Sequence, residues 1–509
     1  MKQKLLYKVS AIVLTVFAGG CMVGPDFERP AFFDVSSYFA DEVPSKTSDG
    51  FQNLAAGKEV PSNWWLLFDS PKLNELIVLA LKNNQTLAAS EASLRAAEAA
   101  LYVGEAGLFP AITGGFSSGR SSTGNASPYN LFKASVGIAY NLDIWGGTRR
   151  NIERLQAQVD MAKYELEAAK LTIVSNVITL AISEASLREQ IELLKANIDA
   201  QEKTLNLYKI QFDAGAISRV ELVSQEGTLA GLKVSLPSLE NNLSVTRNAL
   251  TALVGQLPEK QIEQTFTLAD MTLPKEIPLS VPSELVSQRP DIRAAEEALH
   301  AASADIGVAA AARLPNLTLT GGMGTSSGVL EKMFSSGTGL WSIGAEIAGV
   351  IFDAGALAQK EQIAREQFEV MVARYNQTII TSFHQVADTL YALEADAKAF
   401  VHQKESMNAS KAYLDLSAIQ FDAGAVSMIE LLQAERGYYA ARSLFVQSAA
   451  TRLSDTVALF AALGGGFESK TEVPSDNWKA LLSSKTNNIS DKKQEELNAA
   501  NEKDIKKKK

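Results

Sequence analysis

The sequence has very little cysteine and histidine, and fewer basic than acidic residues. One Cys and three His in 509 residues exclude an internal disulfide framework, a Cys-rich zinc site and an iron–sulfur site. Lys and Arg total 48 against 58 Asp and Glu, a formal net charge of −10 that is not typical of nucleic-acid binders. No catalytic triad, phosphate-binding loop or dinucleotide fingerprint occurs. We therefore expect no catalytic residue, metal, cofactor or nucleic-acid partner.

Long hydrophobic runs are also absent after the N-terminus, although 46% of the residues are hydrophobic. The most apolar stretch, 171–182, is interrupted by four polar residues. A helical membrane span needs about 20 mostly apolar residues. If the mature protein crosses a membrane, it must do so with strands.

Residues 1–20 have the layout of a secretory signal peptide, with three Lys before the apolar segment Val9–Phe17. The small residues Ala18-Gly19-Gly20 lead directly to Cys21, as in the bacterial lipobox, whose Cys becomes the first mature residue and carries lipid. The alternative is a plain signal peptide with a chance Cys. Met22 is not Asp, which disfavours retention at the inner membrane. We expect Cys21 to be lipidated in an exported protein.

The rest of the chain is internally duplicated. The seven residues Ile210–Ala216 recur as Ile419–Ala425, at an offset of 209, and the match extends on both sides. The period is too long for a short-repeat solenoid. The sequence therefore predicts a lipidated N-terminal extension (21–71), a first repeat (72–255), a linker (256–283), a second repeat (284–466) and a polar tail (467–509).

Each repeat shows the same order of patterns. An Ala-rich helical stretch (72–108 and 284–313) precedes a β-hairpin (110–143 and 315–353) in which apolar and polar residues alternate. A long helical hairpin follows (148–255 and 356–463). Its first arm contains neither Pro nor Gly for some 65 residues, and a helix of that length reaches on the order of 100 Å.

The two helical hairpins turn on the same residues. Gly supplies a left-handed C-cap, Ser caps the return helix, and Glu three residues later is placed for a capping box. These are Gly215, Ser218 and Glu221 in the first repeat and Gly424, Ser427 and Glu430 in the second.

Strands of this length with one apolar face fit a transmembrane β-barrel. Four strands cannot close a barrel, and open edges are not tolerated in lipid. Two, three or four chains would supply 8, 12 or 16 strands, so this interpretation requires an oligomer. The alternative is a soluble sheet with helices packed around it, which leaves the long helices without a purpose.

Five further strings of residues occur in a fixed order between residues 21 and 466. They are Val23–Pro30, the Trp- and Asn-containing segment Trp64–Asn84, Leu142–Gly146, Arg289–Glu296 with Ile306–Ala309, and Leu431–Arg436. In this order they resemble the outer-membrane efflux protein family, the TolC-like outer-membrane factors, in its NodT-type lipoprotein branch.

The resemblance implies an α+β membrane protein of the bacterial outer membrane. It implies a homotrimer with a 12-stranded β-barrel, continuous with a long periplasmic α-helical barrel. Such proteins are exit ducts of tripartite efflux systems. A periplasmic adaptor (membrane fusion protein) and an inner-membrane transporter, here expected to be of the RND type, deliver drugs or other small toxic compounds. The duct itself uses no cofactor.

The resemblance also implies roles for the helical tips. The residues expected to dock the adaptor and gate the duct are Phe212, Asp213, Gly215, Ser218, Phe421, Asp422, Gly424 and Ser427. Beside them, Glu221, Glu430, Gln433 and Arg436 are expected to line the periplasmic aperture, where rings of acids favour cations. Position 433 is Gln where relatives often carry Asp, which weakens the ring. The simpler interpretation of all these residues is turn and capping chemistry.

Two other functions remain open at this point. One is a type I protein-secretion duct within the same family. The other is a periplasmic coiled-coil lipoprotein without a pore, whose strands would be soluble. The sequence does not identify the substrate, the cognate pump or the role of the Lys-rich tail.

Overall fold

The computed structural model describes residues 22–30, 46–58, 60–122, 124, 127–279 and 282–466. The predicted signal peptide, Cys21 and the polar tail 467–509 lie outside the described residues. All statements below concern the described part of the chain.

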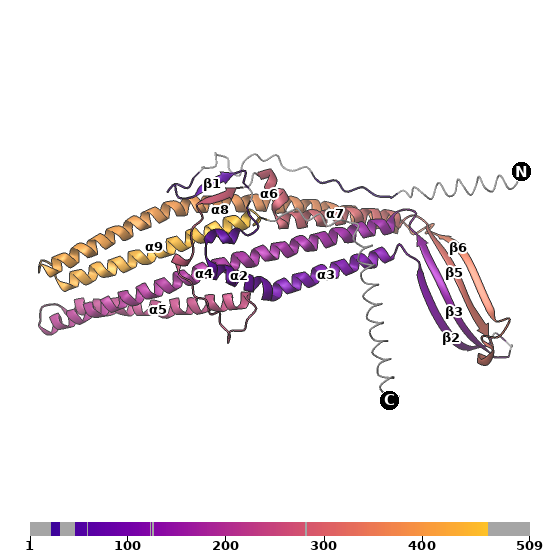
Figure 1. The fold of residues 1–509 in the computed structure, drawn as a ribbon, viewed down its shortest axis with the longest axis horizontal. Helices are drawn as coiled ribbons and strands as arrows, with labels where there is room; N and C mark the ends of the chain where they lie inside the picture. Colours follow the sequence, from indigo (N-terminus) through magenta and orange to yellow (C-terminus); the bar gives the residue numbers. More distant parts are fainter. Residues whose placement is uncertain are drawn as a thin grey trace, which may run out of the picture. The chain divides into compact units, whose positions relative to one another are not determined.

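The two repeats have the same construction (Figure 1). The first contains α2 (Pro71–Asn83), α3 (Gln85–Ala106), β2 (Ala111–Ser121), β3 (Tyr129–Leu142), α4 (Gly147–Asp213) and α5 (Arg219–Leu253). The second contains α6 (Pro282–Gln288), α7 (Pro290–Ala311), β5 (Asn316–Ser327), β6 (Gly339–Ala348), α8 (Ala356–Asp422) and α9 (Met428–Ala462). Three of the four pairs of corresponding helices are equally long, with 22 residues in α3 and α7, 67 in α4 and α8, and 35 in α5 and α9. The duplication thus extends to the lengths of these helices, whereas α2 has 13 residues and α6 has seven.

The helical stretch expected before each β-hairpin is divided into two helices in both repeats. Between α2 and α3, Asn84 is extended (φ −65°, ψ 125°), and its side chain accepts hydrogen bonds from the N–H groups of Thr86 and Leu87. This N-cap starts a new helix. Between α6 and α7, Arg289 precedes Pro290, whose ring disfavours the helical conformation at the residue before it.

The long helix α4 is the central packing element of the structure. It lies against α3, α5, α7 and α9, while α8 packs against α7 and α9. By length and composition alone α4 could also cross a membrane, since one 18-residue window has a mean hydropathy of 1.4. Its middle third, however, supplies core side chains: Ile173, Val174, Val177, Ile178, Ala181 and Ile182. Packing in the core therefore accounts for these six apolar residues.

The main core lies where the segments outside the two repeats meet the helices. The short 3-10 helix η1 (Trp64–Phe68) places the buried rings of Trp64 and Phe68 against Phe460 of α9, with 5.2 Å between the ring centroids of Trp64 and Phe460. A two-stranded parallel sheet, which the sequence did not predict, joins β1 (Asn53–Ala56) to β4 (Glu276–Leu279). The N-terminal extension and the linker thus fold together beside the core.

The four strands of the two β-hairpins form one antiparallel sheet in the order β2-β3-β5-β6. The two hairpins are joined by pairing of β3 with β5, from Phe132 opposite Ser327 to Leu142 opposite Leu317. β2 and β6 are the edges, and neither pairs with another described strand on its outer side. The prediction of two hairpins with four strands is confirmed.

Candidate functional site

The two faces of the four-stranded sheet differ in chemistry. Directly paired residues point to the same face, and successive residues alternate between faces. One face carries large apolar side chains: Ile112, Phe116, Phe132, Val136, Ile138, Tyr140, Leu142, Leu317, Leu319, Met323, Trp341, Ile343 and Ile347. The other carries small or polar ones, with large apolar or aromatic side chains only towards the loop end of the sheet. Its members include Thr113, Ser117, Ser135, Gly137, Asn141, Thr318, Thr320, Gly322, Ser326, Ser342, Tyr129, Leu131 and Leu340.

The apolar face has the height of a bilayer core. Along β3 it extends from Phe132 to Leu142, ten residue steps or about 34 Å at the usual rise per residue. Strands of membrane barrels tilt by about 40°, which reduces this to about 26 Å, close to the apolar band of about 25 Å found in such barrels. Many of these side chains are exposed, among them Trp341 at 80% and Ile343 at 83%. An apolar surface of this kind needs a cover of lipid or protein.

The two tips have nearly identical backbones. In the first, the N–H of Gly215 donates to the carbonyl of Phe212 (2.9 Å) and that of Ala216 to Gln211 (2.8 Å). In the second, Gly424 and Ala425 donate to Phe421 and Gln420 over the same two distances. With φ of 73° and 72° at the two glycines, both turns are Schellman motifs. Gly215 and Gly424 are exposed, and nothing lies within 4 Å of where their side chains would be.

The capping box expected at both tips is complete only at the first. There the Glu221 carboxylate accepts from the Ser218 N–H (2.6 Å), and the Ser218 hydroxyl accepts from the Glu221 N–H (3.3 Å). The bond from the Ser218 backbone lowers the pKa of Glu221. At the second tip the Ser427 hydroxyl accepts from the Glu430 N–H (3.2 Å), but among the described contacts the Glu430 carboxylate does not return a bond. Glu430 is exposed, so water can solvate its carboxylate instead.

The other two expected aperture residues lie further along α9. Gln433 is exposed, whereas Arg436 is half-buried beside Tyr208 of α4. Burial lowers the pKa of Arg436, and its Nε has no hydrogen-bond partner among the described residues. The structure thus brings Glu221 and Glu430 close to their tips, but it does not show Arg436 pairing with either of them.

A second feature is the segment Met22–Pro30, here called the strap, which starts directly after Cys21. The Val23 N–H donates to the carbonyl of Trp145 (3.0 Å), at the junction between β3 and α4. The fully buried guanidinium of Arg150 donates to the carbonyls of Val23 (3.2 Å) and Gly24 (3.3 Å) and to the carboxylate of Asp26 (2.7 Å). The strap is therefore fixed at the end of α4 nearest the sheet.

The strap also binds α7. Gly24 (φ 95°) lies so close to Gly307 that a side chain on Gly24 would overlap the Gly307 backbone. Further along, the ring of Phe27 stacks on His300 at 4.4 Å between centroids, and Arg29 pairs with the buried Glu296. The sequence analysis identified the segment Val23–Pro30 and the two segments of α7 separately, but it did not predict that they are in contact. The residues that could have indicated the contact are Gly24, Gly307 and Arg29.

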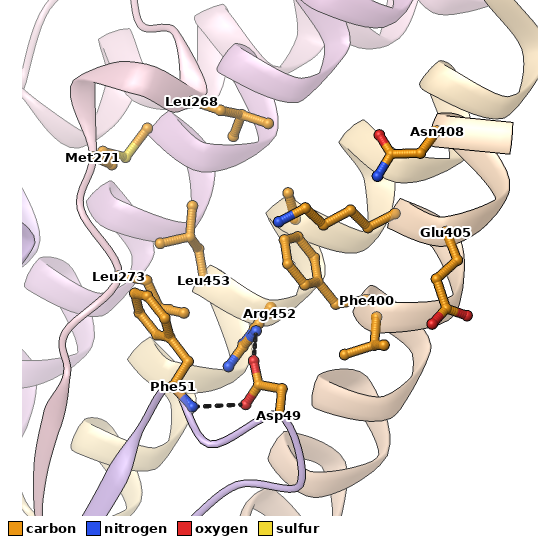
Figure 2. A pocket seen from close by; sticks show the side chains of 13 residues that line it. Asp49, Phe51, Leu268, Met271, Leu273, Phe400, Glu405, Asn408, Arg452 and Leu453 are labelled. Atoms are coloured by element: carbon orange, nitrogen blue, oxygen red, sulfur yellow. Dashed lines mark hydrogen bonds and ion pairs between the residues drawn. The ribbon is translucent and has the colours of Figure 1, made fainter. Parts of the chain in front are cut away.

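A third feature is a cavity of about 600 Å³ beside α8 and α9 (Figure 2). At its base Arg452 of α9 forms an ion pair with Asp49 (2.5 Å) and lies over the rings of Phe51 and Phe400. The Phe51 N–H also donates to Asp49 (3.2 Å). These contacts fasten the N-terminal extension to the second helical hairpin. No group of three or more described His, Cys, Asp or Glu side chains could hold a metal ion.

Residues 76–256 and 281–465 match the family described as Outer membrane efflux protein. These two matches cover both repeats. The chain belongs to the outer membrane efflux protein family.

Relatives and solved structures agree with this membership. The chain is 29% identical to the toluene efflux pump outer membrane protein TtgF of Pseudomonas putida, over 91% of this chain and 98% of the relative. It is 27% identical to Nodulation protein T of Rhizobium leguminosarum bv. viciae, over 91% and 94%. The crystal structure of the Campylobacter jejuni CmeC outer membrane channel aligns with a TM-score of 0.79 and 25% identity, over 91% and 98%. The resemblance to the NodT-containing family and the expectation of a TolC-like channel fold are confirmed.

Proposed function

We propose that this protein is the outer-membrane exit duct of a tripartite efflux system. Three copies would form a 12-stranded β-barrel that continues into a long periplasmic α-helical barrel. The duct would carry drugs or other small toxic compounds and needs no cofactor. Relatives named for toluene and antibiotic efflux support this class of substrate.

The observation that carries the proposal is the sheet with two unlike faces and two unpaired edges. Its apolar face matches the thickness of a bilayer, and an edge in lipid must be paired. A ring of sheets pairs β6 of one copy with β2 of the next and encloses the small, polar face. The helices α4 and α8 follow the strands after only a few residues, so the enclosed space continues between them.

The strap supports a lipid anchor at Cys21. Met22 is adjacent to that residue, and an added side chain at Gly146 would meet Met22. Gly146 separates β3 from α4, the level at which a barrel would leave the membrane. A lipid on Cys21 would therefore start next to the inner surface of the outer membrane. Cys21→Ala should abolish labelling by a fatty-acid probe, and unchanged labelling would contradict the assignment.

The exposed tips are the proposed contact with a periplasmic adaptor, which in turn binds an inner-membrane transporter of the RND type. Both tips present the same backbone, so each copy offers two similar docking points. Of the two tip acids, the Glu221 carboxylate accepts a hydrogen bond from a backbone N–H, whereas the Glu430 carboxylate accepts none among the described contacts. We therefore expect Glu430, rather than Glu221, to dominate cation preference at the aperture, since rings of carboxylates favour cations.

The test is conductance of the full-length protein in planar bilayers, together with the susceptibility of a deletion strain to drugs and solvents. We expect discrete conducting steps and increased susceptibility. Glu430→Gln should lower the cation-to-anion permeability ratio more than the control Glu221→Gln. A protein that inserts but never conducts would favour a coiled-coil lipoprotein without a pore. Lost protein export with unchanged susceptibility would favour a type I secretion duct.

A further inference from the structure

The small, polar face of the sheet contains two charged side chains among the described strand residues. Lys133 lies on β3 and Glu346 on β6, and both are exposed. Neither forms an ion pair or a side-chain hydrogen bond in the described structure. A charged side chain without a partner on this face changes the electrostatic potential experienced by any solute that passes along the face.

The strand register places the two charges at opposite ends of the sheet. Glu346 pairs with Thr318, which pairs with Asn141, one residue before the end of β3 nearest the helices. Lys133 pairs with Ser117 and Ser326, towards the loop end. From Asn141 to Lys133 is eight residue steps, or about 27 Å. Each charge therefore lies well beyond the other's screening length, which is about 8 Å at physiological salt.

The surface between the two charges is nearly smooth. A row of small residues, Thr113, Gly137, Gly322 and Ser342, crosses all four strands in register. A hollow of about 520 Å³ lies against this region, lined mostly by residues of the polar face, Lys133 among them. In a 12-stranded barrel these residues leave a wide path, so charge is the main feature that can distinguish solutes there.

We infer that Glu346 and Lys133 give the barrel interior an axial electrostatic polarity. Three copies of Glu346 make its periplasmic end negative, and three copies of Lys133 make its outer end positive. Cationic solutes are favoured where they enter the barrel, and anionic solutes are favoured near the exit. This inference rests on the proposed function, because it requires that the polar face line a pore.

The register supplies matched reporters for each charge. Thr318→Cys places a thiol opposite Glu346, and Ser326→Cys places one opposite Lys133. The full-length protein in lipid nanodiscs is treated with a cationic and an anionic methanethiosulfonate of similar size, and the ratio of the two reaction rates is measured. The native Cys21 background is subtracted. These reagents can enter from the open outer end whether or not the tips are closed.

Glu346→Gln should lower the cation-to-anion rate ratio at the Thr318→Cys reporter by about threefold, a screened Coulomb effect at the spacing of paired residues. It should leave the ratio at the Ser326→Cys reporter unchanged. Lys133→Gln should raise the ratio at the Ser326→Cys reporter only. Glu346→Asp, which keeps the charge, should preserve the ratio and so exclude a folding defect.

The inference is overturned if both reporters react but neither charge substitution alters its own ratio. A different result would contradict the proposed barrel itself. In that result the polar-face reporters stay unreactive, while Ile347→Cys on the apolar face reacts with the same reagents.

Discussion

Arg150 is the residue whose loss should free the strap without unfolding the helices. Its guanidinium is buried and makes three hydrogen bonds to the strap, two to backbone carbonyls and one to Asp26. Arg150→Lys keeps the charge but not the planar set of donors. Hydrogen bonds from charged groups contribute about 1.5–3 kcal/mol each, but a lysine retains one, and freed carbonyls regain water. We therefore expect the strap to be bound about 3 kcal/mol less tightly.

Hydrogen exchange at the Val23 amide measures this loss, because that amide is protected by its bond to Trp145. A weakening of about 3 kcal/mol corresponds to exchange roughly a hundredfold faster. Arg154→Lys is the matched control, since Arg154 lies one turn further along α4 and bonds to Asn151 and Asp305. Asp26→Asn should have less than a fivefold effect, because the Asp26 side chain is 85% exposed. A change below about fivefold for Arg150→Lys would refute the reasoning.

Three further predictions concern the tips and the second helical hairpin. Ser218→Ala should destabilise its tip by about 1 kcal/mol, more than Ser427→Ala, because only the first capping box is complete; equal hydrogen exchange at both tips would contradict this. Gly424→Val forces a branched side chain to a φ of 72°, at a cost of about 1–2 kcal/mol, and should reduce efflux and adaptor co-purification; normal values of both would count against docking there. Burial, with a hydrogen bond that the protonated carboxyl donates to Asp396, raises the pKa of Asp455 to about 7 from a usual 3.8. Stability should therefore fall as pH rises from about 4 to 7, and Asp455→Asn should flatten the dependence of melting temperature on pH; a parallel curve would refute this.

The elements that sequence analysis predicted are those specified by local patterns. The alternation along Phe132–Leu142 and Trp341–Ile347 was enough to predict strands and their two faces, because side chains alternate with a period of two. The tips were predictable because Gly215 and Gly424 end a helix in a way that few other residues can. The long helices α4 and α8 were predictable because their sequences contain neither Pro nor Gly over some 65 residues.

The features that were missed depend on contacts between distant segments. Arg29 and Glu296 are 267 residues apart, and no periodicity relates them. The close approach of Gly24 to Gly307 likewise becomes visible only when α4 and α7 are packed together. The helix break at Arg289 was accessible, because Pro290 follows it, but the Ala-rich sequence after Pro290 outweighed that signal. The half-formed cap at Glu430 depends on the rotamer of one exposed side chain, which sequence does not specify.

The two edges of the sheet have a consequence for genetics. β2 and β6 differ in sequence, so in the proposed ring of three copies each copy offers one kind of edge to each neighbour, and every seam would join unlike partners. A single copy with a damaged β6 would leave one seam unpaired and so spoil the whole assembly. If such a variant were made in equal amount with the wild type and mixed at random, only about one trimer in eight would be fully intact. Alleles that damage an edge strand should therefore be dominant, whereas alleles that prevent synthesis should be recessive.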